Sequence, residues 1–107
     1  MASTPKRLHG PAQVSNAAAT KYTVPAVTKT VIRHVHIQNP SASPVTFTMS
    51  VGADAAATRV FDAFSIPANS VYDWWTYLVA EAAEIVQALA GTNNILTLTI
   101  DGDERTL

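Results

Sequence analysis

Hydrophobic and polar residues alternate along several short segments of this chain. In the segment VTFTMSV at residues 45–51, apolar side chains occupy every second position and hydroxyl side chains fill the positions between them. A period of two places successive side chains on opposite faces of a β-strand, with the apolar face against a core. This segment is therefore predicted to be a half-buried strand.

Further strand signals occur at residues 21–24, 28–38, 59–64, 71–78, 84–89 and 95–100. Prolines, glycines and asparagines between them, as in NPSASP and GTNN, are typical of turns. The alanines and glutamates within residues 77–90 would also suit a helix, but Ile85-Val86 and the glycine turn after them favour a strand. Short strands at a spacing of about ten residues indicate a sandwich or jelly roll. The predicted fold is all-β: a single antiparallel β-sandwich or jelly roll of roughly seven to eight short strands.

Alternation also assigns faces within two of these strands. In residues 28–38, one face would carry Val31, Arg33, Val35 and Ile37, and the other Ile32, His34, His36 and Gln38. In residues 71–78, Tyr72 and Trp74 would share one face, and Asp73, Trp75 and Tyr77 the other. Some of these aromatic side chains must therefore face away from the core.

Residues 1–19 do not show this alternation. The segment MASTPKRLHGPAQVSNAAA consists mostly of small and polar residues and contains two prolines. It is predicted to be an extended N-terminal arm that binds neighbouring subunits, in front of a β-sandwich domain at residues 20–107.

Composition narrows the class of protein. The chain has 107 residues, enough for one domain. It has no cysteine, which excludes disulfides, thiolate zinc ligands and a cysteine nucleophile. We expect neither a membrane span nor a signal peptide, because no apolar run approaches about 20 residues.

Charge is divided unevenly along the chain. Residues 1–53 carry five basic residues and no acid, whereas residues 54–107 carry eight acids and two arginines. This density of basic residues is too low to predict nucleic-acid binding. Attraction between the two halves, within the fold or between identical copies, explains the uneven charge better than nucleic-acid binding does.

His34-Val35-His36 is the most specific chemical signal. A strand would project both imidazoles from one face, as a metal pair requires. Cupin-type barrels add a glutamate just downstream, but Gln38 and Asn39 stand there instead. We therefore predict no metal or other cofactor, and place the pair on a half-exposed strand face or in a subunit contact.

The acidic run Asp101-Gly102-Asp103-Glu104 is too short for a calcium loop, which needs a further carboxylate about twelve residues from the first. A solvated tail or a contact with the basic half is expected. The chain has no nucleophile elbow, glycine-rich phosphate loop or carboxylate pair in an apolar setting, so no enzymatic activity is predicted.

The aromatic run YDWWTY at residues 72–77 holds both tryptophans. Tryptophan and tyrosine often anchor protein interfaces. The predicted interface residues are Lys6, Arg7 and Leu8 of the arm with Tyr72, Trp74, Trp75 and Tyr77. An alternative from another class is a carbohydrate-binding module that stacks sugars on Trp74 and Trp75.

The run KYTVPA at residues 21–26, followed by TVIR at 30–33, HIQN at 36–39 and IPANS at 66–70, resembles a group of small tailed-bacteriophage proteins. The resemblance covers roughly residues 8–103 and departs at Val27, where the group usually has glycine. It implies a virion component of β-sandwich type on the capsid surface or at the tail.

The predicted function is that of a non-enzymatic structural protein of a bacteriophage virion, assembled in the cytoplasm of the bacterial host. A capsid decoration or stabilisation subunit is the first choice, and a tail, collar or baseplate accessory the second. Expected partners are the major capsid protein or tail components and further copies of the chain. A glycan is possible but not favoured, and neither nucleic acid nor membrane is expected.

Overall fold

The computed structural model describes residues 3–107, and within that range it contains eight β-strands and no helix. The strands are β1 (Ser3–Gln13), β2 (Ala19–Thr23), β3 (Thr28–Asn39), β4 (Val45–Val51), β5 (Arg59–Ile66), β6 (Ser70–Ala80), β7 (Ile85–Ala90) and β8 (Thr97–Thr106). The prediction of an all-β fold is confirmed. Among the described residues, no helix has the length and apolar character that a bilayer crossing requires.

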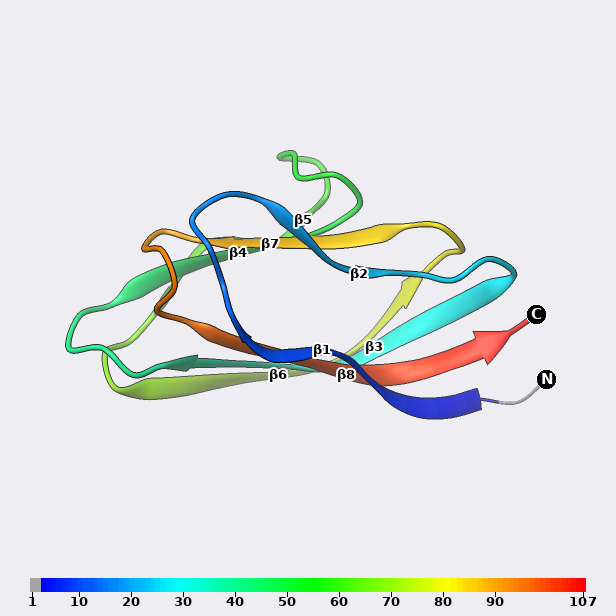
Figure 1. Ribbon diagram of the computed structural model, residues 1–107, viewed down its shortest axis with the longest axis horizontal. Coiled ribbons are helices and arrows are strands. Elements are labelled where there is room, and N and C mark those ends of the chain that lie inside the picture. Colours follow the sequence, from blue (N-terminus) through cyan, green and yellow to red (C-terminus); the bar gives the residue numbers. More distant parts are fainter. Residues whose placement is uncertain (1–2) are drawn as a thin grey trace.

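The strands form two four-stranded sheets that face one another (Figure 1). Sheet A has the order β1-β8-β3-β6, and sheet B the order β2-β7-β4-β5. The antiparallel pairs β1–β8, β2–β7, β3–β6 and β4–β5 show that the chain is one long hairpin, bent between β4 and β5. The hairpin is rolled so that successive pairs fall in alternate sheets, which is the architecture of a jelly roll.

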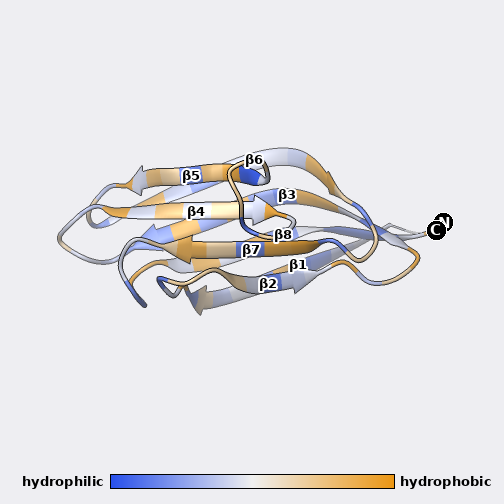
Figure 2. Cartoon of the chain, turned by 90° about the horizontal axis from the view of Figure 1, so that it is seen from above, coloured by the Kyte–Doolittle hydropathy of each residue, from blue (hydrophilic) through white to orange (hydrophobic). Residues whose placement is uncertain are grey.

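Apolar side chains from both sheets fill the space between them. The largest fully buried ones are Phe47, Ile32, Ile37, Met49, Ile66, Leu96, Leu98 and Ile100. Most of β7 is coloured as hydrophobic in the second view (Figure 2). The strand predicted at residues 45–51 has the observed bounds of β4, and its apolar positions Val45, Phe47 and Met49 are buried. The hydroxyl positions Thr48 and Ser50 are buried as well, so β4 is more deeply buried than its alternation predicted.

The prediction of an extended N-terminal arm in front of the sandwich is wrong for most of its length, and residues 1–2 of the arm lie outside the described residues. Residues 3–13 form β1, which pairs with β8 from Ser3 opposite Arg105 to Gln13 opposite Thr97. Leu8 and Val14 belong to the core. The alternation of β1 is hidden because two register shifts interrupt it, and because an edge strand tolerates proline. The sandwich therefore begins with β1 and not at residue 20.

The predicted alternation of β3 holds on each side of a break but not across it. Between Ile32 and His34 the register shifts against both β6 and β8. Ile32 and Val35 are both fully buried, whereas Arg33 is exposed, so the alternation changes phase at this point. Gly102 of β8 lies opposite the break, where an added Cβ would come within 2.0 Å of the Val31 carbonyl oxygen. Only glycine fits this close approach of β8 to β3.

The turn between β2 and β3 contains Val27 at a φ of 53°, in the left-handed region. Its side chain is 61% exposed, so it contributes little to the core. A β-branched residue is strained in this conformation, whereas glycine adopts it freely. The backbone of this turn therefore suits glycine better than valine.

We expect the substitution Val27→Gly to raise the free energy of unfolding by about 1 kcal/mol, because it relieves left-handed strain. This corresponds to a rise in Tm of roughly 4 °C, measurable by differential scanning calorimetry. Val60→Gly, at an exposed position within β5, is the control and should lower the stability by roughly 1 kcal/mol. A Tm for Val27→Gly below that of the wild type would contradict the inference that Val27 is strained.

Leu8→Ala should lower the free energy of unfolding by about 2–4 kcal/mol, because it leaves a cavity in the core. The neighbouring Arg7 is exposed, and Arg7→Ala should change the stability by less than about 0.5 kcal/mol. Urea unfolding of both variants measures the difference. Equal stabilities would mean that β1 is not part of the core.

Candidate interface on the outer face of sheet A

Strand β6 is an edge strand, and its outward side carries a row of exposed apolar residues. Val71, Trp75, Tyr77 and Val79 are 53%, 73%, 62% and 40% exposed. We call these four residues the β6 apolar row. A long edge strand also presents unpaired backbone groups, which makes it a template for pairing with another chain. The row therefore combines the two features expected of a protein contact.

The predicted faces of β6 are confirmed. Tyr72 and Trp74 are half-buried and pack against the core, where the Trp74 ring meets Phe61 edge to face at a centroid distance of 4.9 Å. Trp75 and Tyr77 face outward and are exposed. Because the two tryptophans lie on opposite faces of one strand, they do not form a joint platform for a sugar.

The other predicted interface residues do not join the β6 apolar row. Lys6 and Arg7 are exposed on β1, at the opposite edge of sheet A, with β8 and β3 between. Leu8 is only 8% exposed and lies in the core, so its prediction as an interface residue is wrong.

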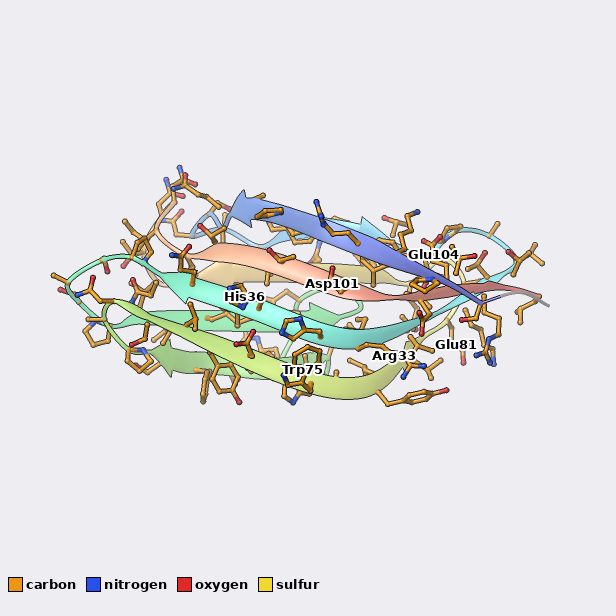
Figure 3. The ribbon with its side chains drawn as sticks, turned by 90° about the horizontal axis from the view of Figure 1, so that it is seen from below. Arg33, His36, Trp75, Glu81, Asp101 and Glu104 are labelled. Atoms are coloured by element: carbon orange, nitrogen blue, oxygen red, sulfur yellow. The ribbon has the colours of Figure 1, made fainter. Side chains whose placement is uncertain are left out.

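Beside the row lies a group that we call the histidine–aspartate cluster: His34 and His36 of β3, Asp73 of β6 and Asp101 of β8. Oδ1 of Asp73 lies 2.8 Å from His34 Nε2 and 2.5 Å from His36 Nδ1. His34 Nδ1 is 3.6 Å from Oδ2 of Asp101. Figure 3 shows His36, Asp101 and Trp75 gathered near the middle of the outer face.

Strand pairing explains why these residues meet. Asp73 is directly opposite His36 in the pairing of β3 with β6, and Asp101 is opposite His34 in the pairing of β3 with β8. Trp75 is opposite His34, and the two rings stack at a centroid distance of 3.8 Å and an angle of 7°. The stack restricts the His34 ring to one orientation.

The imidazoles determine the ionisation of Asp73. A carboxylate only accepts hydrogen bonds, so a ring nitrogen that bonds to it must carry the proton. Hydrogen bonds from His36 and then His34 hold the pKa of Asp73 below its ordinary value of 3.8. Asp73 therefore remains a carboxylate to lower pH than an ordinary aspartate does.

The acidic run near the C-terminal end of the chain meets the basic half, as expected. Asp103 lies 2.5 Å from Arg33, and Glu104 lies 3.2 Å from Lys6. The Arg33 guanidinium carbon also lies 5.3 Å from the centre of the Tyr77 ring, within the range of a cation–π contact. The unequal halves thus attract one another within a single chain.

Glu104 also connects the two sheets, a contact that the sequence did not predict. Tyr22 of β2 donates its hydroxyl hydrogen to Glu104 of β8, and the same hydroxyl lies 2.8 Å from that of Thr30. Burial, with the Glu104 hydrogen bond next, raises the pKa of Tyr22 to about 12. The hydroxyl therefore stays protonated, and remains a donor to Glu104, further into the alkaline range than an ordinary tyrosine.

A hollow of about 390 Å³ lies at one end of β3 and β6, lined by Gln38, Asn39, Pro40, Asn69, Ser70 and Val71. None of these side chains is titratable, and neither tryptophan contributes. The hollow therefore supports neither acid–base chemistry nor sugar stacking on Trp74 and Trp75.

No protein-family model matches the chain, and no curated protein matches its sequence. Solved structures do resemble it. The coat protein of tobacco streak virus is 11% identical with a TM-score of 0.51, over 98% of this chain and 86% of that one. The dimer of that coat protein gives a TM-score of 0.52 at 11% identity, over 97% and 85%. A structure of infectious bursal disease virus, strain Gx, is 9% identical with a TM-score of 0.50, over 96% of this chain and 30% of that chain.

At these identities the likeness concerns the fold. The shared feature is a β-sandwich that extends over nearly the whole of this chain. The predicted single antiparallel sandwich or jelly roll is confirmed.

In the Asp73→Asn variant, the free energy of unfolding should fall less steeply in acid than in the wild type. Because the pKa of Asp73 is lower in the folded chain than in the unfolded one, its stabilising contribution is present above about pH 4. The contribution is lost as the pH falls through the lowered pKa, so the wild type should lose more stability than the variant below about pH 4. Urea unfolding at a series of acidic pH values measures this difference. Parallel profiles for both proteins would contradict the assignment.

Proposed function

We propose that this chain is a non-enzymatic structural protein of a virion, held in the particle by protein–protein contacts. The observation that carries the proposal is the β6 apolar row, which exposes Trp75 and Tyr77 on a long edge strand. The similarity of the fold to viral coat proteins supports the same role. The row would bind a second copy of the chain or the major capsid protein.

The chemistry of the row suits such a contact. Aromatic side chains and arginine are enriched in the buried centre of protein interfaces, and both occur here as Tyr77 with Arg33 beside it. The free backbone edge of β6 adds a hydrogen-bonding side along which a partner strand would extend sheet A. Side-chain burial and backbone hydrogen bonds would therefore both stabilise the contact of β6 with its partner.

Within this class, we propose a capsid decoration or stabilisation subunit of a tailed bacteriophage. The support is the resemblance carried by KYTVPA at residues 21–26 and IPANS at residues 66–70. The strained turn at Val27 adds to it, because the group usually has a glycine there and the backbone has a glycine-like φ.

Removal of apolar surface from the row should weaken assembly. The double variant Tyr77→Ser/Val79→Ser leaves the core and the histidine–aspartate cluster intact, and should weaken self-association or capsid binding by tenfold or more, about 1.4 kcal/mol. The control Val60→Ser alters a 37% exposed residue on the edge strand of sheet B and should assemble like the wild type. Sedimentation velocity, with and without purified capsids, measures both. Undiminished assembly of the Tyr77→Ser/Val79→Ser variant would contradict the role of the row.

The place of the protein on the particle is tested separately. Virions from the source organism would be separated into heads and tails, and each fraction analysed by mass spectrometry. Stoichiometric protein in the heads supports capsid decoration, whereas protein confined to the tails supports the tail or collar role. Its absence from both fractions would contradict the virion proposal.

A further inference from the structure

We propose that His34, His36 and Asp73 form a binding site for a first-row divalent transition-metal ion on the outer face of sheet A. One ligand atom from each of the three residues lies within 4.8 Å of the others. The proposal does not depend on the virion role, because it concerns the isolated chain.

The backbone holds the three residues in place. His34 and His36 project from the same side of β3, and Asp73 lies opposite His36 on β6. Strand β3 is hydrogen-bonded on both sides, to β6 and to β8, so its side chains start from a well-supported backbone. The break at Ile32 is what gives His34 and His36 their outward direction. The donor atoms therefore converge without a rearrangement of the strands.

The donor set selects the class of metal. Two imidazole nitrogens and one carboxylate oxygen suit zinc, copper, nickel or iron, whereas calcium and magnesium favour oxygen donors throughout. With metal–ligand bonds of about 2.0–2.1 Å, tetrahedral donors stand roughly 3.3 Å apart. The present separations from Asp73 Oδ1 are 2.8 Å to His34 and 2.5 Å to His36. These donor atoms must therefore adjust by side-chain rotation to reach the tetrahedral spacing.

The metal would replace the protons that now bridge these groups. The ring nitrogens that face Asp73 would give up their hydrogens on binding. A neutral imidazole does this by moving the hydrogen to its other ring nitrogen, and an imidazolium by releasing it to solvent. Because the side chains of His36 and Asp73 are 36% and 38% exposed, the fourth position opens to water. An open position on a three-ligand site leaves room for a further ligand from solvent or from a partner.

A second layer of residues supports the first. If His34 binds through Nε2, its Nδ1–H points toward the Asp101 carboxylate, 3.6 Å away. A carboxylate behind a metal-binding histidine fixes the tautomer and makes the ring a better donor. Trp75 stacks on the same ring and limits its rotation. Asp101 and Trp75 are thus positioning residues that orient His34 and do not themselves bind the metal.

The site is tested by titrating zinc into the tag-free chain and measuring the heat of binding by isothermal titration calorimetry. The wild type should bind one ion per chain. Asp101→Asn should weaken binding by about tenfold, as expected for a carboxylate behind a ligand. His36→Ala and Asp73→Asn should weaken it more. Gln38→Ala, an exposed position beyond the site on β3, is the matched control and should bind zinc like the wild type.

Trp75 provides a second readout. Copper(II) bound beside the stacked His34 ring should quench Trp75 fluorescence, and Trp75→Phe should lose this quenching while it still binds zinc. His36→Gln replaces His36→Ala if the latter fails to fold, as judged by circular dichroism. Either of two results would overturn the proposal: no saturable zinc binding by the wild type at millimolar zinc, or wild-type affinity in folded His36 and Asp73 variants.

Discussion

The break in register between Ile32 and His34 determines what lies inside and outside sheet A. If β3 alternated without interruption from Ile32, then His34 and His36 would point into the core, and Val35 and Ile37 would point to solvent. The shift reverses this arrangement, so that Ile32, Val35 and Ile37 all face the core. Burial of two imidazoles without partners would cost several kilocalories per mole, roughly 1–3 for each unsatisfied group. The core and the outer cluster therefore depend on the same irregularity.

Much of this fold could be predicted from periodicity, because most strands have one apolar face. Residues 45–51 show this best, since their alternation gave the observed bounds of β4. The break within β3 could not be predicted, because a local alternation carries no information about a shift imposed by two neighbouring strands. Strand β1 was missed for a related reason: bulges interrupt its pattern, and only Leu8 within it is buried.

The sites depended on topology, which the local sequence does not encode. The sequence pointed to His34 and His36, but the carboxylate that meets them is Asp73, on a strand that pairs with β3 only in the jelly-roll order. The same holds at the end of the sandwich. The turns after β3 and β5 were both predicted, yet nothing indicated that buried Asn39 would donate to the carbonyl oxygens of Ser43, Ile66 and Pro67 and so connect them.

The long-hairpin layout also decides the order in which the molecule can form. Within residues 3–107, β4 and β5 are the only paired strands that follow one another along the chain. The other pairings join distant residues, such as Ser3 with Arg105 and Ala19 with Ala88. Pairings across such distances carry a large loop-closure cost and are made late. During synthesis, β1 leaves the ribosome first but has no partner until β8 has been translated. Leu8 therefore remains exposed to water and to other nascent chains until almost the whole chain has been synthesised.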